Sequence, residues 1–271
     1  MRGILVLLMC AASALASDQI VSEVTISEYV FTIRTTNYGM THDLLVTRRD
    51  KPVWSLSEYF VKLLDRDSLG LPRDLNDDQI PDVIIETFSG GAHCCFVQYV
   101  VSLGNRFEVL DTIDHAGLWS DRDGDRLWEV TASDLTLDYW KLPHSDSPIP
   151  FVILEATDSG FVPNVELMRK PAPTATEVLA VLRDARSRDW RDYNKLSETM
   201  FMSPAQAVLH RHLVELIYSG NAKTGLEVLE TGWPLFILGR EQYTLDLLEK
   251  LRTSPYWEVL AEMNAGTVFS N

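Results

Sequence analysis

The chain has 271 residues, and its 24 lysines and arginines against 39 aspartates and glutamates give a formal net charge of −15. This acidic balance excludes the basic surface with which proteins hold nucleic acid or anionic lipid, so divalent cations or basic partners suit the chain better. The length is sufficient for one large or two ordinary domains with a real hydrophobic core.

The first sixteen residues have the pattern of a cleaved secretory signal peptide. Met1-Arg2 supplies a positive start, residues 4–12 are almost wholly apolar, and small residues at Ala14 and Ala16 mark a cleavage site after residue 16. A buried first strand or helix is the alternative interpretation. No later stretch has the roughly 20 apolar residues of a membrane helix. The sequence therefore predicts a periplasmic or secreted protein without a transmembrane segment.

Short apolar runs alternate with turn signals from residue 17 to about residue 170. Strands this short, at this interval, predict an antiparallel all-β domain, either propeller-blade-like or sandwich-like. The first expected hairpin pairs residues 29–35 with residues 43–48 around Thr36-Asn37-Tyr38-Gly39. Further strands are expected at residues 59–64, 83–88, 95–103, 107–113, 127–132, 135–140, 151–156 and 161–167.

The character of the chain changes at Lys170-Pro171-Ala172-Pro173, and residues 171–271 predict an α-helical domain. Thr174 or Thr176 can cap a first helix, and Ser203-Pro204 has the residues typical of a helix start. The fold class expected is α+β, with an N-terminal antiparallel all-β domain followed by a C-terminal helical domain. Helices are expected at residues 174–188, 204–218, 222–230, 241–252 and 254–263.

An acidic loop precedes the strand expected at residues 83–88. Its oxygen-bearing side chains fall at positions 1, 3, 5 and 9 of a nine-residue turn, and the carbonyl group of the seventh position can complete a cage. Calcium takes six to eight hard oxygens of this mixed kind, whereas a surface turn that binds nothing is the alternative. The predicted ligands are Asp74, Asn76, Asp78 and Asp82, with the carbonyl oxygen of Ile80.

A second loop repeats this spacing 47 residues later and therefore favours calcium over chance acidity. The loop contains two guanidinium groups, Arg122 and Arg126, which offset part of its negative charge. Because Pro81 restrains the backbone of the first loop, we expect the first loop to bind calcium more strongly. The predicted ligands of the second loop are Asp121, Asp123, Asp125 and Glu129, with the carbonyl oxygen of Leu127.

The two loops resemble those of FG-GAP or VCBS repeats, the calcium-loop units of integrin-type β-propellers. The match extends through the strand at residues 83–88 and the turn Gly90-Gly91, and the run at residues 89–96 resembles exported bacterial proteins of this kind. The resemblance implies that the eight side chains named above are calcium ligands. The sixth loop position, usually Gly, is Gln79 in one loop and Arg126 in the other.

The resemblance covers about residues 60 to 168 and none of the helical part. About three hairpin units can be counted in the β region, whereas a closed propeller needs at least about four blades. An incomplete, open or sandwich-like β domain is therefore expected.

Two adjacent cysteines form a second candidate site. Cys94 and Cys95 are the cysteines that remain once Cys10 leaves with the signal peptide, and an oxidising compartment favours a vicinal disulfide between them. With His93 they could instead form the redox or soft-metal site of an exported enzyme.

Three tryptophans lie in sequence near the second acidic loop. Trp119, Trp128 and Trp140 could stack on a glycan, although core packing explains aromatic residues in a β domain equally well. No serine-hydrolase, zinc-protease or phosphate-binding motif is present in the sequence. The leading hypothesis is an exported, non-catalytic calcium-binding protein whose helical domain contacts a protein partner.

Overall fold

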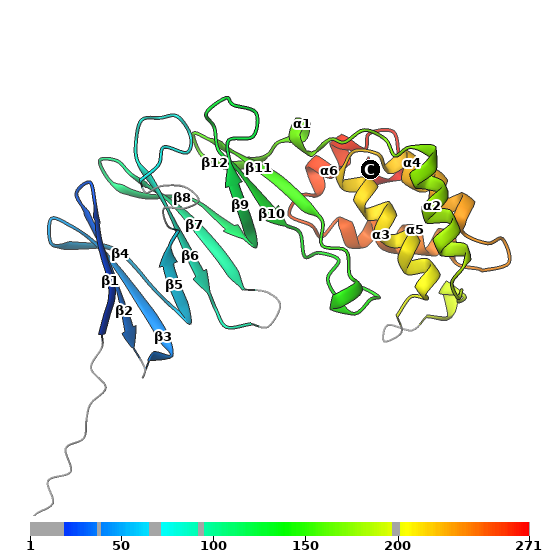
Figure 1. Ribbon diagram of the computed structural model, residues 1–271, viewed down its shortest axis with the longest axis horizontal. Coiled ribbons are helices and arrows are strands. Elements are labelled where there is room, and N and C mark those ends of the chain that lie inside the picture. Colours follow the sequence, from blue (N-terminus) through cyan, green and yellow to red (C-terminus); the bar gives the residue numbers. More distant parts are fainter. Residues whose placement is uncertain (1–18, 37–38, 65–71, 92–94, 197–200, 271) are drawn as a thin grey trace, which may run out of the picture. The chain divides into compact units, whose positions relative to one another are not determined.

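The computed structural model describes residues 19–36, 39–64, 72–91, 95–196 and 201–270, and the expected signal peptide at residues 1–16 lies outside them. The described residues form three four-stranded antiparallel sheets followed by six α-helices (Figure 1). This order confirms the expected α+β fold class. None of the helices described is both long enough and apolar enough to cross a bilayer.

The chain divides into two compact units. The first unit contains the chain up to Arg73 together with Ile80–Val109, and the second contains Asp74–Gln79 together with Leu110–Asn271. The last four strands and all six helices described belong to the second unit.

The first unit is built from two meanders in which each strand pairs with its neighbour in the chain. The expected first hairpin is confirmed, and the strands at its two sides were not predicted. The first sheet contains β1 (Gln19–Ile26), β2 (Tyr29–Thr36), β3 (Thr41–Arg48) and β4 (Lys51–Glu58). The second sheet contains β5 (Phe60–Leu63), β6 (Asp82–Phe88), β7 (Phe96–Leu103) and the strand β8 (Phe107–Asp114), whose residues from Leu110 onward are counted in the second unit.

One hydrophobic core joins the two sheets of the first unit. Phe31 and Val46 of the first sheet and Ile85 and Val101 of the second are at most 1% exposed and belong to one cluster. The core residues of the first sheet include alternate residues of β2 and β3, as expected for strands that pack one face against a core. Burial of these side chains, at about 25 cal/mol per Å² of apolar surface, stabilises the pairing of the sheets.

The third sheet belongs to the second unit and is also a meander. Its strands are β9 (Ala116–Ser120), β10 (Glu129–Ser133), β11 (Phe151–Thr157) and β12 (Gly160–Pro163), paired in the order β12-β11-β10-β9. Val130, Val152 and Leu154 point into the core, whereas Glu129 and Glu155 share the other face of the sheet. A four-stranded antiparallel sheet is also the unit of a propeller blade.

One strand prediction in this region is wrong and another is wrong in part. Residues 135–140 form turns, because the Asp134 carboxylate accepts the Thr136 N–H at 2.8 Å and the Leu135 carbonyl accepts the Asp138 N–H at 2.9 Å. Asp and Asn side chains that bond the backbone two residues on favour turns over strands. The strand expected at residues 161–167 ends at Pro163, where the chain enters α1.

Two of the expected helices begin where their capping signals predict, whereas the last begins at Trp257 and not at residue 254. Thr174 and Glu177 form a capping box at the start of α2, and Ser203 and Gln206 form one at the start of α3, with Pro204 in its first turn. The six helices are α1 (Val165–Met168), α2 (Ala175–Arg186), α3 (Pro204–Tyr218), α4 (Ala222–Gly232), α5 (Arg240–Leu251) and α6 (Trp257–Met263).

Helix α3 packs against both α2 and α4 (Figure 1). The approach of α3 to α4 is close because Gly225 lacks a side chain: a Cβ atom there would lie 2.7 Å from Leu213. A buried carboxylate then ties the helices to the third sheet. Asp134, which is 3% exposed, accepts hydrogen bonds of 2.5 Å from the hydroxyl groups of Tyr218 and Ser254. These two bonds therefore hold the chain just after β10 against the helical part of the second unit.

Candidate metal centre

The second acidic loop connects β9 to β10, and backbone N–H groups hold its carboxylates in place. Each of the four predicted side-chain ligands has one oxygen that accepts such a bond, which leaves its other oxygen for an ion. The bonds run from Gly124 to Asp121 at 2.7 Å, from Asp125 to Asp123 at 3.3 Å, from Leu127 to Asp125 at 2.8 Å, and from Arg122 to Glu129 at 2.7 Å.

These carboxylates converge in two overlapping groups. Oxygens of Asp121, Asp123 and Asp125 lie within 4.8 Å of one another, and so do oxygens of Asp123, Glu129 and Glu155. Asp123 belongs to both groups, so the two groups adjoin each other. Calcium binds oxygens at about 2.3–2.6 Å, and two ligands on opposite sides of an ion are then separated by about twice that distance. The observed separations fit a shared cation.

Glu129 is the most unusual residue of this centre. Its side chain is fully buried, and its Oε1 atom has no hydrogen-bond partner within the described part of the chain. Burial raises the pKa of Glu129, and the neighbouring carboxylates of Asp123, Asp125 and Glu155 raise it further. A buried carboxylate normally has its lone pairs satisfied, because leaving one unpaired costs several kcal/mol. A cation against Oε1 removes this cost.

Glu155 is a candidate ligand that the sequence analysis missed. It lies on β11 directly opposite Glu129 of β10. Like charges at directly opposed positions of an antiparallel pair are destabilising, by roughly 0.2–1 kcal/mol, unless another charge compensates them. No spacing rule within the acidic loop identifies Glu155, because its position depends on the register between two strands. The pairing of the apolar runs at residues 127–132 and 151–156 was the one available signal.

The first acidic loop has a different geometry. Both carboxylate oxygens of Asp74 accept backbone N–H groups, from Asp78 at 3.1 Å and from Gln79 at 2.8 Å. The amide nitrogen of Asn76 donates to Asp78 at 3.3 Å, and the buried Oδ1 of Asn76 has no hydrogen-bond partner among the residues described. Among the described residues, the converging acidic groups include none of this loop's carboxylates.

The last two predicted ligands of the first loop belong to the other compact unit. Asp82 is 1% exposed at the start of β6, and its backbone pairs with that of Arg73; Ile80 begins the same segment. The part of the loop at residues 74–79 contacts the second loop, because the Trp128 N–H donates to the Leu75 carbonyl at 2.9 Å.

The residue at the sixth position of each loop is not a glycine, but it has a backbone conformation that glycine favours. Gln79 has a φ of 65° and Arg126 a φ of 80°, in the left-handed region that non-glycine residues rarely adopt. Both positions therefore have a backbone conformation that glycine adopts without a steric cost. A non-glycine residue in this region costs of order 1–3 kcal/mol.

The remaining candidates from the sequence are placed as follows. His93 and Cys94 lie outside the described residues, so the vicinal disulfide and the redox alternative stay predictions; Cys95 precedes β7 with a φ of 93°.

Trp119 is 9% exposed and packs edge-on against Phe161, with ring centres 5.2 Å apart. Core packing therefore accounts for Trp119.

Trp128 and Trp140 are half-buried. Trp140 packs against His210, with ring centres 5.4 Å apart, and against Tyr243, with ring centres 6.4 Å apart. The structure thus gives Trp140 a packing role within the helical part of the second unit.

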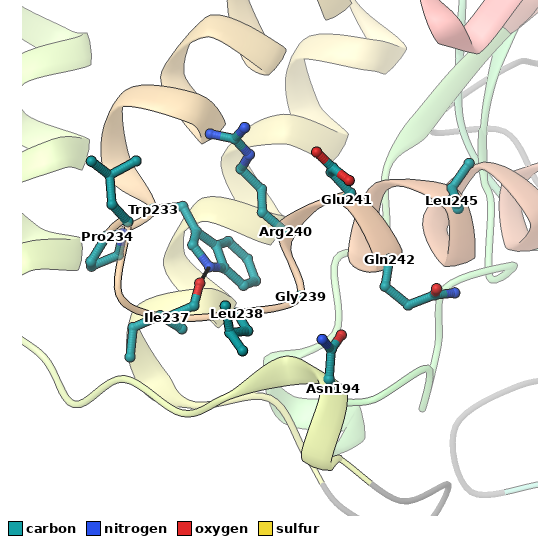
Figure 2. Close-up of a pocket in the computed structure, with 11 residues that line it drawn as sticks. Asn194, Trp233, Pro234, Ile237, Leu238, Gly239, Arg240, Glu241, Gln242 and Leu245 are labelled. Atoms are coloured by element: carbon teal, nitrogen blue, oxygen red, sulfur yellow. Dashed lines mark hydrogen bonds between the residues drawn. The ribbon is translucent and has the colours of Figure 1, made fainter.

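An exposed apolar loop connects α4 to α5. Figure 2 shows the indole of Trp233 donating to the Ile237 carbonyl, a bond of 2.9 Å that closes the loop on itself. The residues at its tip, Leu235 and Phe236, are 95% and 82% exposed, and a hollow of about 510 Å³ lies beside them. Adjacent exposed apolar side chains of this size are typical of interaction sites.

No protein-family model, curated protein or solved structure matches the chain. The resemblance to FG-GAP or VCBS repeats therefore stays a prediction from the loops. A proposal for the function therefore depends on the geometry of the metal centre alone.

Proposed function

We propose that the protein is an exported, non-catalytic calcium-binding protein whose second acidic loop holds the ion. The observation that supports this most is the buried Oε1 of Glu129, which has no hydrogen-bond partner in the described chain and lies within 4.8 Å of oxygens of Asp123 and Glu155. Removing one partner from a buried charged group costs about 3–5 kcal/mol. A divalent cation is the simplest partner for this arrangement.

The donor set favours calcium over other metals. All five side chains are carboxylates, and the Leu127 carbonyl can add a sixth hard donor. Zinc and copper prefer imidazole and thiolate ligands, and magnesium keeps several waters in a strict octahedron. Calcium accepts six to eight oxygens in an irregular cage. The second loop, with its converging carboxylates, is thus the stronger site, and this reverses the order expected from the sequence.

The ion has a structural role. It joins the loop at residues 121–129 to Glu155 of β11 and so pins the loop to the neighbouring strand. The exposed loop tip at Leu235 and Phe236 contacts the protein partner, which binds these two side chains in an apolar pocket. Aromatic side chains that enter such pockets supply much of the binding energy at interfaces.

Calorimetric titration of the mature full-length chain with calcium tests the proposal. Saturable binding is expected, with a dissociation constant on the order of 10⁻⁴ to 10⁻³ M, as in extracellular calcium modules. Saturating calcium should then raise the free energy of unfolding by roughly 1–3 kcal/mol. Asp123→Asn should weaken binding, whereas Glu227→Gln, an exposed change on α4, should not. No binding heat and an unchanged melting temperature in chelator would refute the proposal.

A further inference from the structure

An apolar groove of the second unit lies beside the third sheet. Residues of β9, β10 and β11 line it together with residues of α1 and α3, and its volume is about 750 Å³. Leu118 and Phe151, which both line it, are 78% and 64% exposed. Ligand pockets for small molecules are typically about 300–1,000 Å³ in volume and mostly apolar.

The strand register makes the inner wall of this groove a continuous surface. Thr131 pairs with Ile153 and Ser133 pairs with Phe151 across β10 and β11, and all four side chains line the groove. Because side chains alternate along a strand, these residues share one face of the sheet with Glu129 and Glu155. The groove therefore lies on the same face of the sheet as Glu129 and Glu155.

The groove is lined by more basic than acidic side chains, although the chain as a whole is acidic. Arg122, Lys170 and Arg211 line it against one acidic residue, Glu215, in a protein whose formal net charge is −15. Arg211 has an acidic neighbour, Asp146, at 3.8 Å.

The other two cations have no carboxylate partner among the residues described. Arg122 donates to the hydroxyl group of Thr131, and neither Arg122 nor Lys170 forms an ion pair with any residue that the structure describes. Two basic side chains beside an apolar surface are complementary to a ligand with an apolar body and an anionic end.

We propose that this groove binds an amphipathic anion with an acyl chain and a carboxylate head group. The chain lies along Leu118, Phe151 and Ile153, and the head group accepts hydrogen bonds from Arg122 and Lys170. Bonds between ionised partners are about twice as strong as neutral ones, so the cations fix the orientation of the ligand. This inference goes beyond the calcium proposal and does not depend on it.

Titration of the full mature chain with dodecanoate, below its micelle concentration, tests the inference. Saturable binding of one molecule per chain is expected, and dodecanol, which lacks the charge, should bind at least about tenfold more weakly. Equal affinity for the alcohol, or no saturable binding of dodecanoate, would overturn the inference. So would binding of an acidic peptide without binding of dodecanoate.

Two pairs of variants locate the binding. Arg122→Gln and Phe151→Ser should each weaken dodecanoate binding about tenfold. Their matched controls, Arg183→Gln on α2 and Leu235→Ser on the exposed loop, should leave it unchanged. Phe151 is largely exposed, so its variant should keep the native circular dichroism spectrum; Leu118→Ser, also exposed, provides a second apolar test. Unchanged affinity in all three groove variants would contradict the inference. Calcium titration of the same variants separates this outcome from failure of the calcium proposal.

Discussion

Glu129 and Glu155 are direct partners in the antiparallel pairing of β10 with β11, so two carboxylates stand side by side on one face of the third sheet. Oxygens of both lie within 4.8 Å of one another and of an oxygen of Asp123. In a strand pair without an ion, this arrangement opposes folding. With a divalent cation between them, the same carboxylates hold a loop to a strand. The stability of the second unit should therefore depend on calcium.

Glu155→Gln should have opposite effects with and without calcium. In chelator, the variant loses a repulsion against Glu129 and should be more stable than the native protein, by roughly 0.2–1 kcal/mol. In saturating calcium it loses a ligand and should gain less stability from the ion than the native protein does. Urea unfolding in both conditions measures the two effects. Glu227→Gln on α4 is the control, and equal shifts of one sign in both conditions would contradict the prediction.

The two acidic loops can be ranked by one substitution in each. Asp125→Ala should remove more calcium-dependent stability than Asp78→Ala, because Asp125 belongs to a converging group of carboxylates and Asp78 does not among the described residues. Differential scanning calorimetry with calcium and with chelator gives the comparison. A larger loss for Asp78→Ala would restore the order expected from the sequence.

Arg126→Gly should improve the second site. The substitution relieves a φ of 80° and removes a positive charge from the loop, whereas the exposed ion pair to Asp77 at 3.6 Å contributes little. Because the charge is removed, we expect calcium to bind several-fold more tightly, equivalent to about 1 kcal/mol, whereas relief of the left-handed φ should raise stability with and without calcium. Arg126→Lys keeps both the charge and the backbone conformation, so it should show no gain. An equal gain in both variants would show that neither the conformation nor the charge limits binding.

The pH dependence of stability should report a buried histidine. His210 is fully buried, its Nδ1 lies 2.9 Å from the Tyr243 hydroxyl oxygen, and burial lowers its pKa to about 3. An unfolded histidine has a pKa of about 6.5, so between these values the unfolded state binds more protons. The stability contributed by neutral His210 is therefore complete above pH 6.5 and is lost progressively as the pH falls toward 3.

Urea unfolding at pH 7 and at pH 4.5 measures this loss. His210→Gln should lose less stability between the two pH values than the native protein, because the titrating group is gone. Tyr243→Phe keeps the buried imidazole and should retain the native difference, although it lowers stability at both values. An identical pH difference in the native protein and His210→Gln would show that other groups account for it.

The vicinal cysteines give a separate prediction. Exported protein should carry a Cys94–Cys95 disulfide, because the third cysteine, Cys10, lies in the expected signal peptide. Mass spectrometry of the non-reduced mature chain should show the loss of two hydrogens and no dimer. Two free thiols would instead favour the redox or soft-metal alternative.

Local signals predicted much of the fold. The capping boxes at Thr174 and Ser203 set the starts of α2 and α3, and these depend on residues within four positions of one another. The strand expected at residues 135–140 failed for a related reason. Its alternating apolar residues fit a strand, but the carboxylate of Asp134, one residue earlier, bonds the backbone into a turn.

The candidate site could be predicted only as far as the loop itself. The spacing of Asp121, Asp123, Asp125 and Glu129 lies within one loop, so it can be recognised in the sequence alone. Glu155 joins them through the register of β10 with β11, which depends on pairing between distant segments. The burial of Glu129, which separates the second loop from an ordinary acidic turn, also depends on the packing of the whole unit.

The most direct test of the central claim is the position of the ion in a crystal of the mature protein grown with calcium. An anomalous difference map should show one peak at about 2.3–2.6 Å from Glu129 Oε1, with Asp123 and Glu155 among its ligands. A map with no peak beside Glu129, or with a peak only within residues 74–82, would contradict the account.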